Sequence, residues 1–109
     1  MKNDRVYIEQ ILDAVSKIKI FTQNFTYEQF LNDQKTQSAV IMQLALIGEL
    51  AKHISKETKS QINLPWKDIA GFRDRAIHDY YQIDLEIVWM TITDDLVTIE
   101  NSLQKFLKK

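Results

Sequence analysis

The sequence has 109 residues, a formal net charge of −1 and no cysteine. This length fits one domain and is too short for two. The nearly neutral charge excludes a uniformly basic surface for nucleic acid, so any RNA contact must be local. The lack of cysteine excludes disulfides and thiol chemistry and fits a reducing cytoplasm, and no run approaches the ~20 apolar residues of a membrane span. We therefore predict a single domain, residues 1–109, that is cytoplasmic and makes no membrane contact.

Only two glycines and one proline interrupt a chain rich in helix-forming residues, which predicts an all-α fold. The first predicted helix covers about residues 4–22. Its apolar stripe consists of Ile8, Ile11, Leu12, Val15 and Ile18. A short second helix is predicted over residues 27–32, because Thr26 and Gln29 have the spacing of a capping box.

The third predicted helix runs from about residue 36 to residue 56 and should lie at the centre of the fold. Gly48 falls in its apolar stripe, where it lowers helix stability by up to ~1 kcal/mol relative to alanine. We therefore expect Gly48 to permit the close approach of another helix. Residues 58–64 are predicted to form a polar loop.

The fourth predicted helix opens at Pro65 and carries the densest polar chemistry of the chain, within residues 72–84. One face of this helix consists of Trp66, Ile69, Arg73, Ile77 and Tyr80. An arginine in an apolar stripe must meet a carboxylate, a phosphate, an aromatic ring or another subunit, because its charge is costly to desolvate. Asp74 precedes His78 by four residues, a spacing at which the carboxylate could orient the imidazole.

The polar residues of this stretch cannot converge on one target from a straight helix. Standard geometry puts Arg73 and His78 roughly 140° apart around the axis and about 7.5 Å apart along it, and turns Tyr80 roughly 160° away from His78. Either the helix ends near His78 or a second copy of the chain completes the site.

The last predicted helix covers residues 85–107 and is capped by Asp84. Its stripe is the longest in the chain and contains Leu85, Val88, Trp89, Ile92, Leu96, Ile99, Leu103 and Phe106. The prediction is an up-and-down bundle of four long helices plus one short helix.

The pattern of Arg73, Asp74, His78 and Tyr80 resembles the signature of HEPN domains, and of the HepT-like toxins in particular. Segments 47–52 and 64–71 resemble the sequences that precede the signature in this family, and segments 81–84 and 88–89 resemble the sequences that follow it. Asparagine is commoner than aspartate after the arginine, and the family pattern accepts either. The resemblance covers nearly the whole chain and implies a HEPN-like bundle.

The resemblance implies a toxin of a toxin–antitoxin pair that cuts RNA (tRNA or mRNA) without a metal or other cofactor. It also implies a homodimer that faces two motifs across a cleft. The partner would be a minimal nucleotidyltransferase antitoxin that attaches AMP to Tyr80; a phenol packed in the dimer seam is the alternative for this residue. Glu49 would point toward Arg73, or else pair with a surface histidine, His53, four residues on.

These residue types suit the chemistry of RNA cleavage. An imidazole such as that of His78 can transfer protons near neutral pH, and the planar fork of Arg73 can bind two phosphate oxygens. Asp74 would orient or polarise the His78 imidazole. Arg75 either binds a flanking phosphate or is an ordinary exposed arginine. DNA would be spared, because it lacks the 2′-hydroxyl.

Two other functions remain open. A non-catalytic helical dimer that binds a nucleotidyltransferase or a nucleotide fits the negative net charge. A metal site is poorly supported, because the chain has only two histidines and they lack a metal-binding spacing.

Overall fold

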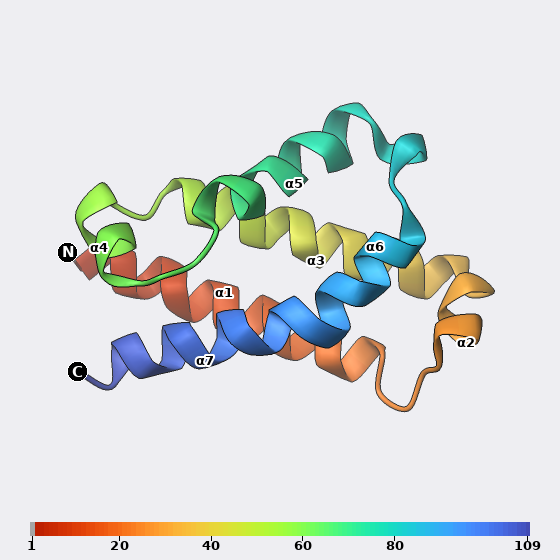
Figure 1. Cartoon of the computed structure of the whole chain (residues 1–109), viewed down its shortest axis with the longest axis horizontal. Coiled ribbons are helices and arrows are strands. Elements are labelled where there is room, and N and C mark those ends of the chain that lie inside the picture. The colour runs from red at the N-terminus through yellow and green to blue at the C-terminus, as the bar shows by residue number, and fades with distance from the viewer. Residues whose placement is uncertain (1) are drawn as a thin grey trace.

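The computed structural model describes residues 2–109, with side chains from residue 4 onward. It shows four long helical segments in Figure 1: α1 (Lys2–Phe21), α3 (Gln34–Lys52), α5 (Trp66–His78) and a C-terminal rod. The rod joins α6 (Leu85–Met90), the π-helical turn η2 (Thr91–Asp95) and α7 (Leu96–Leu107). Successive long segments run in opposite directions, and both termini lie at the same end. Residues 2–109 contain no strand, so the predicted all-α bundle is confirmed.

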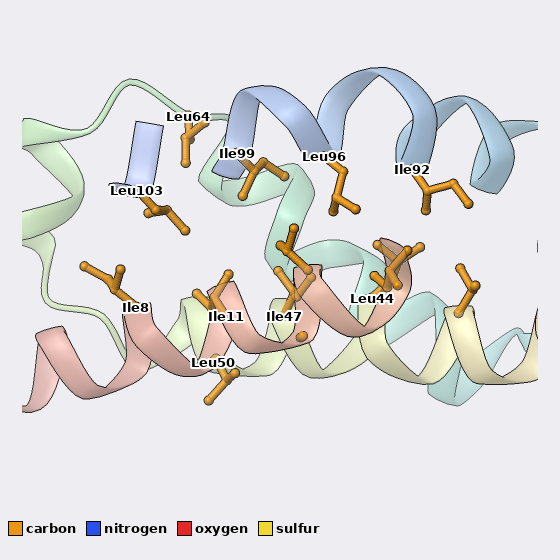
Figure 2. Close-up of a cluster of buried hydrophobic side chains, with 14 of the residues drawn as sticks. Ile8, Ile11, Leu44, Ile47, Leu50, Leu64, Ile92, Leu96, Ile99 and Leu103 are labelled. Atoms are coloured by element: carbon orange, nitrogen blue, oxygen red, sulfur yellow. The ribbon is translucent and has the colours of Figure 1, made fainter. Parts of the chain in front are cut away.

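The core lies where α1, α3 and the C-terminal rod meet. Figure 2 shows Ile8 and Ile11 of α1, Leu44 and Ile47 of α3, and Leu96 and Ile99 of α7 pointing into this shared interior. Helix α3 packs against α1 on one side and against α5 on the other. Helix α5 is therefore an outer element, and it contains no buried residue. The core positions α3, and α3 in turn positions α5.

Two predicted caps are confirmed. In α2 (Tyr27–Leu31), the Thr26 hydroxyl accepts from the amide of Gln29, whose side chain accepts from the amide of Thr26. Before α6, the Asp84 carboxylate accepts from the amides of Glu86 and Ile87. Both caps use contacts within three residues, which is why the sequence alone reveals them.

The predicted loop over residues 58–64 is wrong in its first half. A short helix, α4 (Lys56–Gln61), occupies that stretch, and α3 ends at Lys52 rather than near residue 56. Ser55 caps α4 by accepting from the amide of Thr58. The bundle thus has two short helices, α2 and α4, instead of one.

Asp4 of α1 accepts hydrogen bonds from residues at the start of α4. Its carboxylate accepts hydrogen bonds from the Ser55 amide at 3.0 Å, the Ser55 hydroxyl at 2.6 Å and the Thr58 hydroxyl at 2.6 Å. The Asp4 side chain is buried. Because these partners lie more than fifty residues away in the chain, no local sequence pattern predicts them.

The C-terminal rod is one helical run with the predicted limits, but it contains a π-helical turn at its middle. The Thr91 hydroxyl donates to the Ile87 carbonyl at 2.8 Å, and the Thr93 hydroxyl donates to the Trp89 carbonyl at 2.9 Å. Ile92 and Leu96 remain buried across the turn. Within residues 2–109, none of the helices has the length and apolar character that crossing a bilayer requires.

Candidate functional site

Helix α5 carries the Arg73 to His78 segment and is anchored at its start. The Trp66 indole donates to the carbonyls of Lys59 at 3.2 Å and Ile62 at 3.0 Å, which ties the first turn of α5 to the end of α4. The helix ends at His78, one of the two possibilities that the sequence predicts. Tyr80 then begins a 3-10 turn, η1 (Tyr80–Gln82).

Gly48 allows α5 to lie directly on α3, as predicted. A Cβ atom at position 48 would sit 2.7 Å from the Ile69 carbonyl oxygen and 2.9 Å from the Arg73 Cβ. Both distances are shorter than van der Waals contact, so only glycine fits without moving the helices apart. Helices α3 and α5 therefore approach each other closely beside Arg73.

The Arg73 guanidinium is held by two carboxylates. Its Nε lies 3.1 Å from Glu49 Oε1, and its Nη1 donates to Asp74 Oδ1 at 3.3 Å. The Arg73 side chain is 32% exposed, so part of the guanidinium still reaches solvent. The sequence expectation that Arg73 needs a partner is met within the chain by carboxylates.

Glu49 satisfies both of its predicted alternatives at once. While Oε1 contacts Arg73, Oε2 lies 3.2 Å from Nε2 of His53. The His53 ring also stacks on the ring of Tyr7, with centroids 5.3 Å apart. His53 is a surface histidine, as expected, but it belongs to the same charged cluster as Arg73.

Lys52 is the member of the cluster that sequence reasoning missed. Its Nζ donates to Asp74 Oδ1 at 2.9 Å, across the gap between α3 and α5. Hydrogen bonds from Lys52 and, next, from Arg73 lower the pKa of Asp74 below its usual value, although desolvation opposes them. Spacing does place Lys52 near Glu49 on α3, but its true partner lies 22 residues away.

His78 stands apart from this cluster. Its side chain is exposed at the last position of α5, and the hydrogen bonds and ion pairs among residues 4–109 include none that joins it to Arg73 or Asp74. The expected contact between Asp74 and His78 is thus absent there. One chain assembles Arg73, Asp74 and Glu49 and leaves His78 about one and a half turns along the helix.

Arg75 and Tyr80 have separate surroundings. The Arg75 guanidinium lies 5.6 Å from the centre of the Phe72 ring, and the residue is exposed. The Tyr80 hydroxyl is hydrogen-bonded to the Ser38 hydroxyl of α3 at 3.1 Å, and 37% of Tyr80 is exposed.

An apolar groove runs between α3 and α5 beside Tyr80. It has a volume of about 300 Å³ and is lined by Ser38, Ile41, Met42, Ala45, Ala76, Ile77 and Tyr80; we call it the α3–α5 groove. Met42 is 64% exposed and Ile77 is 55% exposed. Ile77 therefore does not pack inside the chain, although the sequence places it on the apolar face of its helix.

No cluster of three or more histidine, aspartate or glutamate side chains suited to a metal ion occurs among the residues that the structure describes.

Comparisons with known proteins agree on one family. The family model described as Ribonuclease HepT-like matches residues 11–108. A probable ribonuclease HepT of Thermococcus cleftensis is 35% identical, over 98% of this chain and 98% of its own length. A protein of Caldanaerobacter subterraneus subsp. tengcongensis, provisionally named an RNase, is 33% identical over 100% of this chain and 98% of its own. No solved structure matches the chain. The chain belongs to the HepT-like ribonuclease family.

Proposed function

We propose that this chain is the toxin of a toxin–antitoxin pair and cuts RNA without a metal ion. The observation that carries the proposal is the oriented and partly exposed guanidinium of Arg73, on the same helix as His78. Family membership supports the reaction class, since similar proteins carry ribonuclease names. Such a reaction removes a proton from a 2′-hydroxyl, stabilises charge on the phosphate and returns a proton to the leaving oxygen.

Each of these tasks has a candidate residue. His78 moves the protons, because an exposed imidazole can approach the sugar and exchange a proton near neutral pH. Arg73 binds the phosphate through the N–H groups that Glu49 and Asp74 leave free. Glu49 and Asp74 fix the direction of the guanidinium. Arg75 is available to a flanking phosphate.

A second copy of the chain completes the site in this proposal. His78 and Arg73 point in different directions from α5, so one chain alone does not bring them to a single phosphate. The α3–α5 groove supplies a face for the second copy, because Met42 and Ile77 are apolar and exposed beside the motif. A two-fold axis along this face would set the His78 of one protomer near the Arg73 of the other.

Cleavage of RNA in EDTA tests the proposal. The purified protein, confirmed as unmodified by intact mass, is incubated with tRNA and with mRNA beside a His78→Ala variant. We expect cleavage by the native protein and a loss of at least ~100-fold in the variant, the usual contribution of a general acid or base. Circular dichroism checks that the variant keeps its helices. Equal cleavage by both proteins would remove His78 from the mechanism.

The partner in this proposal is a nucleotidyltransferase that acts on Tyr80. The tyrosine oxygen would attack the α-phosphorus of ATP, lose its proton, receive AMP and release pyrophosphate. The added phosphate would bring negative charge and bulk to the motif. We expect a mass gain of one or more AMP units on coexpression, and no gain in Tyr80→Phe. Modification of Tyr80→Phe to the same extent would contradict this assignment.

A non-catalytic dimer is the second candidate, because the chain carries a net charge of −1 and Arg73 is already paired with two carboxylates. If the unmodified protein leaves both RNAs intact, this candidate replaces the nuclease. The nucleotidyltransferase would then be its binding partner.

A further inference from the structure

Each carboxylate of the cluster around Arg73 contacts two basic side chains. Glu49 lies between Arg73 and His53, at 3.1 and 3.2 Å. Asp74 lies between Arg73 and Lys52, and both cations reach the same oxygen, Oδ1. The Lys52 contact, at 2.9 Å, is shorter than the Arg73 contact, at 3.3 Å.

We propose that Lys52 is a positioning residue for Arg73. Lys52 holds the Asp74 carboxylate, so that the Arg73 guanidinium is free to bind an RNA phosphate. The inference rests on the proposed function and assigns a role to a residue outside the Arg73 to His78 segment. Lys52 acts through Asp74 and does not itself touch the RNA.

The charge of the cluster is the first argument. With a neutral His53, Glu49 and Asp74 together outweigh Arg73 by one negative charge, and Lys52 brings the cluster to zero. A polyanion approaches a neutral site more readily than a negative one. Without Lys52, the candidate phosphate site would therefore repel its ligand.

The competition at Asp74 Oδ1 is the second argument. A phosphate that also takes the Nη1 hydrogen that Arg73 donates to Asp74 removes one hydrogen bond from that carboxylate. With Lys52 in place, the released carboxylate keeps a charge-assisted hydrogen bond. Without Lys52, the carboxylate is left unpaired beside the incoming phosphate, and like charges at that distance oppose binding. Lys52 thus lowers the free energy needed to transfer Arg73 from carboxylate to phosphate.

Exposure sets the size of the effect. The side chains of Lys52 and Asp74 are 36% and 53% exposed, so solvent screens the pair. Exposed ion pairs contribute little, so the expected change in a binding constant is at most about fivefold. The effect belongs in KM, because phosphate binding and not proton transfer is altered.

A double-mutant cycle tests the proposal. Lys52→Met, Asp74→Asn and the double variant are compared with the native protein for kcat and KM on an RNA that it cuts, at low salt. We expect Lys52→Met to raise KM about fivefold, as for an exposed pair, with kcat changed less than about twofold. In the Asp74→Asn background the same substitution should change KM less than about twofold. Lys52→Arg should stay near the native KM, because arginine also pairs with Asp74.

The matched control removes another lysine that forms an exposed ion pair with an aspartate, on a different helix. Lys17 pairs with Asp13 on α1 at 3.3 Å, and Lys17→Met causes the same loss of charge away from α5. We expect this variant to keep the native KM. Circular dichroism and thermal unfolding verify that all variants fold.

Two results would overturn the inference. Equal increases in KM with and without Asp74 would mean that Lys52 acts on the RNA by its own charge or contact and not through Asp74, and a native KM in Lys52→Met would mean that it has no role. The dissociation constant of the same variants for fluorescein-labelled tRNA is measured in parallel. If the native protein binds RNA but does not cut it, the proposed function fails while the binding cycle still decides the role of Lys52. If it does not bind either, both fail.

Discussion

Single charged residues in this protein have partners on other helices, and these partners determine what each residue can do. Arg73 lies in an apolar stripe, yet Glu49 on α3 and Asp74 on α5 satisfy it. Asp4 on α1 accepts hydrogen bonds from Ser55, the residue that caps α4. Sequence reasoning identifies Arg73 as needing a partner, and the family resemblance names Glu49 for it. It finds no partner for Asp4 or Lys52, because separations of 22 to 54 residues follow no period. Lys52 escaped notice for this reason.

The role of Asp4 leads to a prediction about stability and pH. Burial tends to raise the pKa of Asp4, but hydrogen bonds from Ser55 and Thr58 outweigh it and lower the pKa below its usual value. The stabilisation is therefore present above the unfolded pKa, near pH 4, and is lost as the pH falls through the folded pKa. Asp4→Asn should reduce the free energy of unfolding at pH 7 by about 1–3 kcal/mol, because it exchanges a carboxylate oxygen for an amide donor.

Denaturant unfolding at several pH values checks this prediction. The difference between the native protein and Asp4→Asn should be largest at neutral pH and should shrink below about pH 4. Asp13→Asn on the same helix is the control, since Asp13 is 67% exposed in its pair with Lys17 and should matter little. A constant difference at all pH values would show that the Asp4 charge is not what stabilises α4.

At the scale of elements, the arrangement depends on how closely α5 approaches α3. Helix α5 has no buried residue, so its position depends on the contact at Gly48 and on the Trp66 anchor. The sequence predicts Gly48 correctly because a glycine inside a helical stripe is costly unless a neighbouring helix needs the space. It fails at α4, whose cap at Ser55 is stabilised by the distant Asp4. It puts Ile77 on the apolar face of its helix but does not show that this side chain lies outside the core, because periodicity cannot distinguish a buried apolar face from an exposed one.

Gly48→Ala should separate α3 from α5. The new methyl group would overlap the Ile69 carbonyl and the Arg73 Cβ. Overpacking of this kind destabilises by about 1–3 kcal/mol, more than the up to ~1 kcal/mol that alanine adds to helix propensity. We expect lower thermal stability and weaker RNA cleavage, since Arg73 moves with α5.

Gly71→Ala is the matched control for this experiment. A Cβ atom at position 71 meets only Arg75 Nη1, at 3.8 Å, which is an ordinary contact. This substitution should raise stability by up to ~1 kcal/mol through helix propensity. If Gly48→Ala were as stable and as active as Gly71→Ala, the close approach at Gly48 would not be what positions Arg73.

At the scale of the whole molecule, one face of α5 has no packing partner within a single chain. The core of α1, α3 and α7 is complete within one chain, whereas the α3–α5 groove leaves apolar side chains in solvent. The bundle was predictable from periodicity, because core stripes recur at helical spacing. The proposed composite site follows from the helical spacing of Arg73 and His78 and from the family resemblance, and it stays a prediction because it needs a second molecule.

The proposed homodimer predicts the effect of a charge in the groove. Met42→Glu should shift the protein toward monomers, because a carboxylate buried at the interface without a partner opposes association. Sedimentation velocity at micromolar concentration measures the change. Met90→Glu is the matched control, since Met90 is 53% exposed on α6, away from the groove. A monomeric native protein, or dissociation by Met90→Glu alone, would contradict the proposed interface.

RNA that lacks a single 2′-hydroxyl tests most directly whether the proposed metal-independent cleavage uses that hydroxyl as its nucleophile. The nucleotide after which the native protein cuts is mapped first, and an oligonucleotide is then made with 2′-deoxyribose at that nucleotide only. We expect that the unmodified RNA is cut in EDTA to leave a 2′,3′-cyclic phosphate, and that the substituted RNA stays intact at that position. Cleavage of both oligonucleotides at the same rate would contradict it, because the 2′-oxygen would then not be the nucleophile.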